Sequence, residues 1–166
     1  MSENSVNQIY TPTGFFTPSV FSILLNHEIS RTARYPSPIS LAILSVCLPA
    51  LLTEDVREAA DLLFLRILRT KLRQTDIISK YDENYVVLLT STDQTGAHIA
   101  IRRVLEQLNT TIVTKHNQTV NLGVCASLAS QPIGSTTTAE NLLDRASQSH
   151  QAARASGPGS LVALNS

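Results

Sequence analysis

The stretch DIISKYDENYVVLLT, residues 76–90, decides how this chain folds. Two runs rich in aliphatic and aromatic residues, Asp76–Lys80 and Tyr85–Thr90, lie on either side of the polar tripeptide Asp82-Glu83-Asn84. Short β-rich runs joined by a few polar residues are typical of a β-hairpin. The sequence therefore predicts a hairpin with a charged tip.

Helical and strand patterns alternate on both sides of this hairpin. Apolar residues recur at helical spacing after Thr17-Pro18 and after Thr53, where a threonine suits the N-cap. The predicted helices are Thr17–Arg34, a segment from Thr53 through Leu68, Thr95–Leu108, and Thr138–Ala155, which stops at Gly157-Pro158-Gly159. The further predicted strands are Ile39–Leu48, Thr110–Val113, Val120–Ser127 and Ser160–Leu164, with a polar turn at Lys115–Gln118.

This order of elements predicts an α/β (α+β) sandwich, with helices packed on a mixed, mainly antiparallel sheet. Its centre is a split βαββαβ arrangement. The length of 166 residues fits one domain. We assign residues 1–9 to a flexible polar tail and residues 10–164 to the domain. So short a tail leaves no room for a preceding sensory domain, and any signal is expected through a ligand or a separate partner.

Composition excludes several classes of function. The 13 basic and 13 acidic residues cancel, and tryptophan is absent, so no nucleic-acid surface is expected. Cys47 and Cys125 fit neither a disulfide scaffold nor a zinc site and are predicted to be buried thiols in a reducing compartment. The four histidines are expected on the surface or on helix faces, none as a metal ligand: His27, His98, His116 and His150. No signal sequence or membrane span is apparent, which predicts a cytoplasmic protein.

Taken in order, these stretches resemble the GGDEF domain, the family of diguanylate cyclases and their inactive relatives. Lys80–Leu89 resembles the family's R-Y-G-G-D-E-F-V-V-L-L, and Pro38–Leu44 resembles its P-L-S-L-L-L-L strand. Further matching pieces are Thr13-Gly14-Phe15, Val120–Ala126 and the segment from Leu142 through Arg154 to Gly157. The resemblance covers about residues 10–162 and implies a nucleotide-cyclase-like sandwich.

The resemblance also implies a reaction, the joining of two GTP molecules into cyclic di-GMP on metal ions held by acids. Where the family has D-x-D on its first strand, this chain has Ser45-Val46-Cys47, which suits magnesium poorly. The guanine-binding block is lost, and the hairpin is one residue shorter than Gly-Gly-Asp-Glu-Phe. We therefore predict no cyclase activity, no cofactor and no metal, with Glu83 and Glu58 as vestiges of the catalytic acids.

One pattern of the family survives. Many members bind their product at an inhibitory site made of R-x-x-D before the hairpin and an arginine on the following helix. Here the pattern is Arg73-Gln74-Thr75-Asp76, and Arg103 falls at the helix position. Guanidinium groups suit guanine edges and phosphates, and Asp76 suits guanine N–H groups. The alternative is a solvated ion pair between Arg73 and Asp76.

Three functions remain open from the sequence. The first is a catalytically inactive regulatory module that binds cyclic di-GMP through Arg73, Asp76 and Arg103. The second is a protein-interaction scaffold with vestigial nucleotide sites, serving a protein partner of a signalling pathway. The third is a residual enzyme that binds GTP and uses Glu83 and Glu58.

Overall fold

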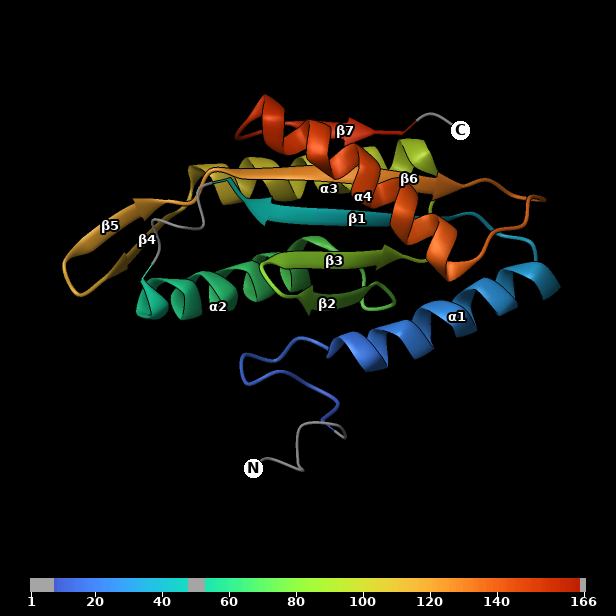
Figure 1. The fold of residues 1–166 in the computed structure, drawn as a ribbon, viewed down its shortest axis with the longest axis horizontal. Coiled ribbons are helices and arrows are strands. Elements are labelled where there is room, and N and C mark those ends of the chain that lie inside the picture. Colours follow the sequence, from blue (N-terminus) through green and yellow to red (C-terminus); the bar gives the residue numbers. More distant parts are fainter. Residues whose placement is uncertain (1–7, 48–52, 165–166) are drawn as a thin grey trace.

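The computed structural model describes residues 8–47 and 53–164, so most of the predicted tail and the end of the first predicted strand lie outside the described residues. Figure 1 shows the elements in sequence colours. The helices are α1 (Pro18–Arg34), α2 (Glu54–Lys71), α3 (Gln94–Thr110) and α4 (Ala139–Ser156). The strands are β1 (Ile39–Val46), β2 (Ile77–Tyr81), β3 (Asn84–Leu89), β4 (Ile112–Lys115), β5 (Gln118–Asn121), β6 (Val124–Gln131) and β7 (Leu161–Ala163).

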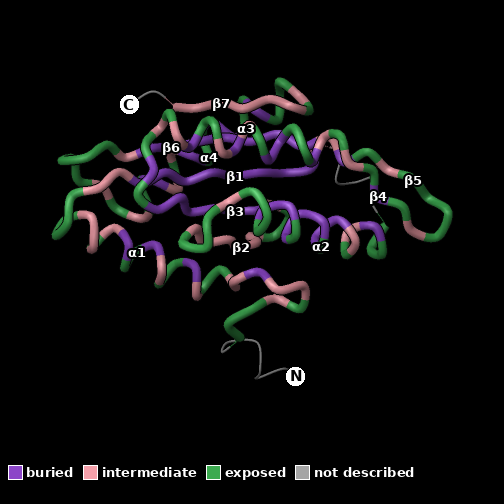
Figure 2. The backbone as a smooth tube through the Cα atoms, turned by 180° about the vertical axis from the view of Figure 1, so that it is seen from behind, coloured by how far each residue is buried: buried purple, intermediate pink, exposed green. Residues whose placement is uncertain are grey.

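The main sheet has five strands in the order β2-β3-β1-β6-β7. The pairs β2–β3, β3–β1 and β1–β6 are antiparallel, and β6–β7 is parallel. The predicted mixed, mainly antiparallel sheet and its βαββαβ core are therefore confirmed. The central strands are buried while the outer faces of the helices are exposed (Figure 2).

Two hydrophobic layers cover the two faces of the sheet, because alternate residues of β1 point to opposite sides. Leu41 and Ile43 pack with Phe21 of α1 and Leu142 of α4. Ala42 and Leu44 pack instead with residues of α2 and α3, such as Phe64 and Ile101. Every residue of β1 is buried, as expected for a strand covered on both faces.

The prediction of one strand over Val120–Ser127 is wrong, because the first residues of this range belong to β5 and the last belong to β6, and these two strands lie in different sheets. β4 and β5 form a separate two-stranded sheet, and β6 begins after Gly123. Gly123 has a φ of 57°, so the chain leaves the extended conformation there. The turn of the small hairpin uses positive φ at His116 (51°) and Asn117 (64°), the pattern of a tight hairpin connection.

Most helix ends follow the predicted capping chemistry. Thr53 accepts a hydrogen bond from the backbone N–H of Val56, and Gly157 ends α4 with a φ of 88°. Thr17 does precede α1, but its hydroxyl donates to the carbonyl of Gln8 (2.8 Å) and caps nothing. This bond ties the N-terminal segment to the start of the helix. Within the described part of the chain, no helix combines the length and the hydropathy needed to cross a bilayer.

Candidate functional site

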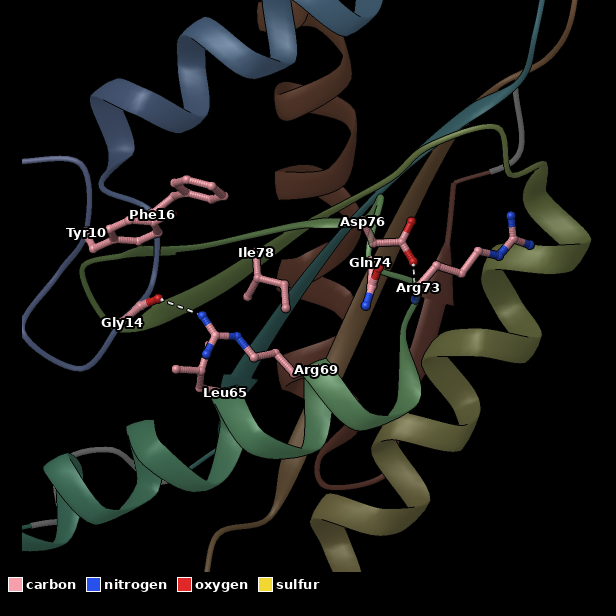
Figure 3. Close-up of a pocket in the computed structure, with 9 residues that line it drawn as sticks. All are labelled: Tyr10, Gly14, Phe16, Leu65, Arg69, Arg73, Gln74, Asp76 and Ile78. Carbon is pink, nitrogen blue, oxygen red and sulfur yellow. Dashed lines mark hydrogen bonds between the residues drawn. The ribbon is translucent and has the colours of Figure 1, made fainter.

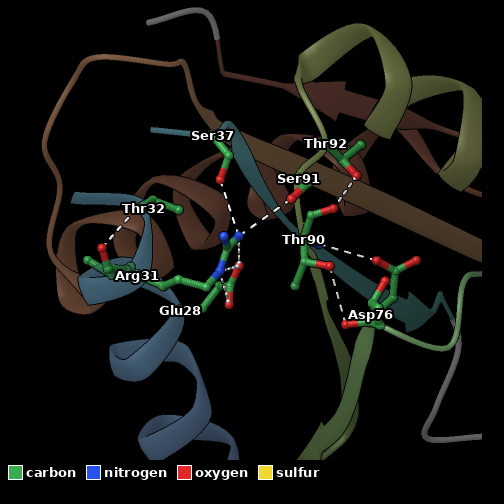
Figure 4. Close-up of polar contacts among 10 residues, drawn as sticks. Glu28, Arg31, Thr32, Ser37, Asp76, Thr90, Ser91 and Thr92 are labelled. Carbon is green, nitrogen blue, oxygen red and sulfur yellow. Dashed lines mark hydrogen bonds and ion pairs between the residues drawn. The ribbon is translucent and has the colours of Figure 1, made fainter. Parts of the chain in front are cut away.

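The loop from Arg73 to Asp76 connects α2 to β2, and the carboxylate of Asp76 braces it. One carboxylate oxygen accepts from the backbone N–H of Arg73 (2.9 Å), and the other accepts from that of Thr90 (3.2 Å) at the end of β3 (Figure 4). Burial raises the pKa of Asp76, while these hydrogen bonds and the charge of Arg73 oppose the rise. Asp76 thus holds the loop against the neighbouring strand.

The three residues predicted for the product site meet at one cavity. Arg73, Asp76 and Arg103 all line a cavity of about 340 Å³ between this loop and α3. Ile99, which is 50% exposed, adds an apolar surface one helical turn before Arg103. The adjacent Arg102 is already engaged, since it donates to the carbonyl of Gly159 (2.9 Å). Of the two neighbouring arginines, Arg103 is therefore the one available to a ligand.

Neither arginine of this cavity makes a close ion pair within the part of the chain that the structure describes. Among the described residues, no carboxylate lies within 4.0 Å of the guanidinium of Arg73 or Arg103. Asp76 accepts its hydrogen bonds from backbone N–H groups and makes no contact within 4.0 Å with the Arg73 guanidinium, whose charge nevertheless acts to lower the pKa of Asp76. Unpaired guanidinium groups at a cavity are suited to bidentate hydrogen bonds with phosphate or with a guanine edge.

The space between α2 and the β2–β3 hairpin is filled by an ionic cluster that sequence analysis missed. Lys80 Nζ donates to both carboxylate oxygens of Asp61 (2.6 and 2.7 Å), and Tyr85 donates its hydroxyl to the same carboxylate. The ring of Tyr85 stacks on Phe64 with centroids 3.8 Å apart. Burial, followed by the charge of Asp61, raises the pKa of Tyr85, so its hydroxyl stays a donor.

Little room remains beside this cluster. The cavity lined by Asp61, Lys80, Tyr85 and Glu83 measures about 20 Å³. A single water molecule needs about 10–15 Å³ of such volume, so this cavity has room for one water molecule and not for a nucleotide. The signal that could have identified Asp61 is its helical phase, because it lies three residues before Phe64 on the buried face of α2.

The two acids predicted as catalytic vestiges do not form a carboxylate pair with β1. Glu83 Oε1 accepts from Arg57 Nη1 (2.8 Å) at the exposed tip of the hairpin. Glu58 is exposed on α2. Ser45 is buried on β1, where Ser45 Oγ and His150 Nε2 lie 2.9 Å apart. These donors do not fit a divalent metal, which prefers several anionic oxygens. No cluster of metal-binding side chains occurs among the described residues.

His150 is the main departure from the expected placement of the histidines. It lies on α4, but its ring faces the sheet and is buried, with Nδ1 lacking a partner among the described residues. Burial, followed by the charge of Arg154, lowers the pKa of His150 to about 4. The ring is therefore a neutral part of the core, close to Ser45 and Cys125.

The two cysteines are both free thiols, as expected. Cys125 is fully buried, whereas Cys47 is only half-buried, so the prediction of two buried thiols is partly wrong. Burial, followed by the hydrogen bond to Cys125, raises the pKa of Cys47 to about 12. A thiol with so high a pKa is a poor nucleophile.

No protein-family model and no curated protein matches the sequence. Solved structures do match. The GGDEF domain of FimX from Pseudomonas aeruginosa superposes with a TM-score of 0.85 at 15% identity, covering 95% of this chain and 99% of that one. The GGDEF domain of DgcB from Caulobacter crescentus, in complex with c-di-GMP, gives 0.82 at 11% identity, covering 95% and 96%.

A third structure contains a second protein. The diguanylate cyclase SiaD from Pseudomonas aeruginosa, in complex with its activator SiaC, gives a TM-score of 0.85 at 21% identity, covering 95% of this chain and 62% of that one. Sequence identities this low establish the fold and leave ligand and activity to the site residues. The chain therefore has the fold of the GGDEF domains of diguanylate cyclases, as the sequence resemblance predicted.

Proposed function

We propose that this domain is a catalytically inactive, GGDEF-like regulatory module that binds cyclic di-GMP. The observation that carries the proposal is the cavity shared by Arg73, Asp76 and Arg103, in which neither arginine has a carboxylate partner among the described residues. A ligand with two phosphates and two guanine bases supplies the anionic groups and flat edges that such arginines bind. The similar DgcB domain was solved with c-di-GMP.

Asp76 has a double role in this proposal. Each of its carboxylate oxygens accepts one backbone hydrogen bond, and a carboxylate has about four acceptor positions in total. The remaining positions suit the N–H groups of a guanine edge. The backbone hydrogen bonds hold the carboxylate in place before the ligand arrives, so the side chain loses little conformational entropy on binding.

Catalytic inactivity is supported by the other end of the domain. A carboxylate on β1 is replaced by Ser45, which bonds to His150. The gap beside the hairpin is filled by Asp61, Lys80 and Tyr85. Two-metal phosphoryl transfer needs anionic ligands that are free for the metals, whereas the described carboxylates of this region, Asp61 and Glu83, are paired with Lys80 and Arg57.

Calorimetric titration with cyclic di-GMP tests the proposal. We expect binding that is weakened about tenfold or more by Arg103→Ala and by Arg73→Ala, as for loss of a charge-assisted bidentate contact. Arg66→Ala is the matched control, because Arg66 is exposed on α2 and is not among the residues that line this cavity. Absence of binding to the wild-type protein, or equal affinity in all variants, contradicts the proposal.

A protein-interaction scaffold is the second candidate. Ile23 on α1 is 67% exposed, and Tyr35 just after the helix is 65% exposed, so α1 and its C-terminal end carry uncovered apolar side chains. Exposed aromatic residues such as Tyr35 are enriched at protein interfaces. The similar SiaD cyclase was solved with a protein activator. A pull-down that recovers a partner with wild-type protein but not with Ile23→Lys favours this candidate.

A further inference from the structure

We propose that a second cavity, on the other side of the Arg73–Asp76 loop, binds a planar aromatic ring that carries one anionic group, such as a nucleoside monophosphate. This site goes beyond the proposed cyclic di-GMP site. The cavity measures about 360 Å³ and lies between the segment around Tyr10–Phe16, helix α2 and strand β2 (Figure 3). Ligand pockets in proteins begin at about 300 Å³, so its size suits a small ligand.

A fixed aromatic pair forms one end of the cavity. Tyr10 and Phe16 stack with ring centroids 5.0 Å apart and an interplanar angle of 22°. The backbone of Phe16 is attached to β2 twice, through its N–H to the carbonyl of Ile78 (3.2 Å) and through its carbonyl to the hydroxyl of Ser79 (2.7 Å). Because Tyr10 remains 52% exposed, its ring has free surface on which another planar group can stack.

Arg69 supplies the positive charge between this pair and the loop. Its guanidinium makes one long hydrogen bond, 3.5 Å, to the carbonyl of Gly14. Within the described ranges, no carboxylate lies within 4.0 Å of it. A guanidinium has five N–H donors, so most of them remain available to a phosphate or carboxylate.

The other lining groups favour an anion with a flat ring. Asp76 is the one acid among the described lining residues, and the two arginines of the lining, Arg69 and Arg73, outnumber it. Gln74 adds an amide that both donates and accepts, and Ile78 and Leu65 add apolar surface. The lining therefore offers an aromatic ring, a cation and an amide around one space, the kinds of group that contact a base, a phosphate and a sugar hydroxyl.

The two proposed sites can be separated because each has its own arginine. Arg73 and Asp76 line both cavities, but Arg69 lines only this one and Arg103 only the other. Figure 3 shows the guanidinium of Arg73 directed away from Arg69 and toward α3. The charge offered to an anion on the Tyr10 side thus comes from Arg69.

Calorimetric titration of the whole chain with GMP tests this inference. We expect GMP to bind. Guanosine lacks the phosphate and inorganic phosphate lacks the aromatic ring, so each is expected to bind at least about tenfold more weakly than GMP. Sodium benzoate tests whether an aromatic carboxylate serves as well. Arg69→Gln and Tyr10→Leu are expected to weaken GMP binding about tenfold, with melting temperatures checked so that unfolding is not mistaken for lost contact.

Arg66→Ala is the control and is expected to leave GMP affinity unchanged, because Arg66 lines neither cavity. The inference is overturned if neither GMP nor benzoate binds, if phosphate alone binds as well as GMP, or if Arg69→Gln keeps full affinity. Loss of cyclic di-GMP binding in Arg103→Ala with GMP binding intact supports both sites. Loss of both ligands in Arg103→Ala overturns the second site and leaves the first.

Discussion

Lys80 and Asp61 form a charge pair in which the ammonium group donates to both carboxylate oxygens, at 2.6 and 2.7 Å. Lys80 is on β2 and Asp61 is on α2, so the pair joins the hairpin to the helix. Tyr85 adds its hydroxyl and lies 5.4 Å, centroid to ammonium, from Lys80. The charges are largely enclosed, and each is compensated by the other.

Replacing Asp61 by alanine is expected to destabilise the domain strongly. The change leaves the ammonium of Lys80 enclosed without a counter-charge and the hydroxyl of Tyr85 without its acceptor. Breaking one partner of a buried ion pair costs about 3–5 kcal/mol. Urea denaturation measures the loss. Glu58→Ala, on an exposed position of the same helix, is expected to stay within about 0.5 kcal/mol of wild type. An equal loss for both variants contradicts the role given to the pair.

Incubation with GTP and magnesium is expected to give no cyclic di-GMP. Ser45 does not supply an anionic metal ligand, and Glu83 is paired with Arg57. Chromatography of the nucleotides after overnight incubation provides the readout. Magnesium-dependent turnover that disappears in Glu83→Gln would instead establish the residual-enzyme alternative and refute catalytic inactivity.

Asp76→Ala is expected to affect stability and ligand binding together. It removes the acceptor for the backbone N–H of Arg73 and of Thr90. The turn that follows Thr90 also contacts α1, because Arg31 donates a hydrogen bond to the hydroxyl of Ser91 (Figure 4). Loosening the end of β3 is therefore expected to weaken this contact with α1 as well. Thr90 is buried, and leaving a buried donor unsatisfied costs about 1–3 kcal/mol.

Thermal unfolding and titration with cyclic di-GMP measure the two effects of Asp76→Ala. Asp144→Ala, at an exposed position on α4, is the matched control and should change neither quantity. Wild-type stability in Asp76→Ala would show that the carboxylate does not brace the loop.

His150 is expected to make stability depend on pH. Its pKa in the folded protein is lowered to about 4, below the value of about 6.5 in an unfolded chain, so the unfolded state takes up the proton first. The contribution of His150 to the free energy of unfolding is fully present above about pH 6.5. It falls as the pH decreases toward 4.

Urea denaturation between pH 7 and pH 4.5 measures this dependence. In His150→Gln the titrating ring is gone, so the decrease in stability over that range should be smaller than in the wild-type protein. Parallel pH profiles for the two proteins would show that the ring does not titrate differently on folding.

The local elements could be predicted because their signals are local. Apolar runs bounded by polar turns indicated β2 and β3, and Thr53 and Gly157 marked helix ends through capping chemistry. The strand assignment failed at Gly123, where a positive φ divides one apolar run between two sheets. Whether a chain bends at a glycine depends on the surrounding packing, and the composition of the run does not reveal it.

The sequence by itself determined the order of helices and strands, the mainly antiparallel sheet and the place of the R-x-x-D loop, because periodicity and turn residues act over a few positions. Only the tertiary structure decided what lies between those elements. It brought Arg103 to Arg73, set Lys80 against Asp61 and buried His150 beside Ser45. Such contacts join residues that are far apart in the chain, and only the packing of helices on the sheet selects which distant side chains meet.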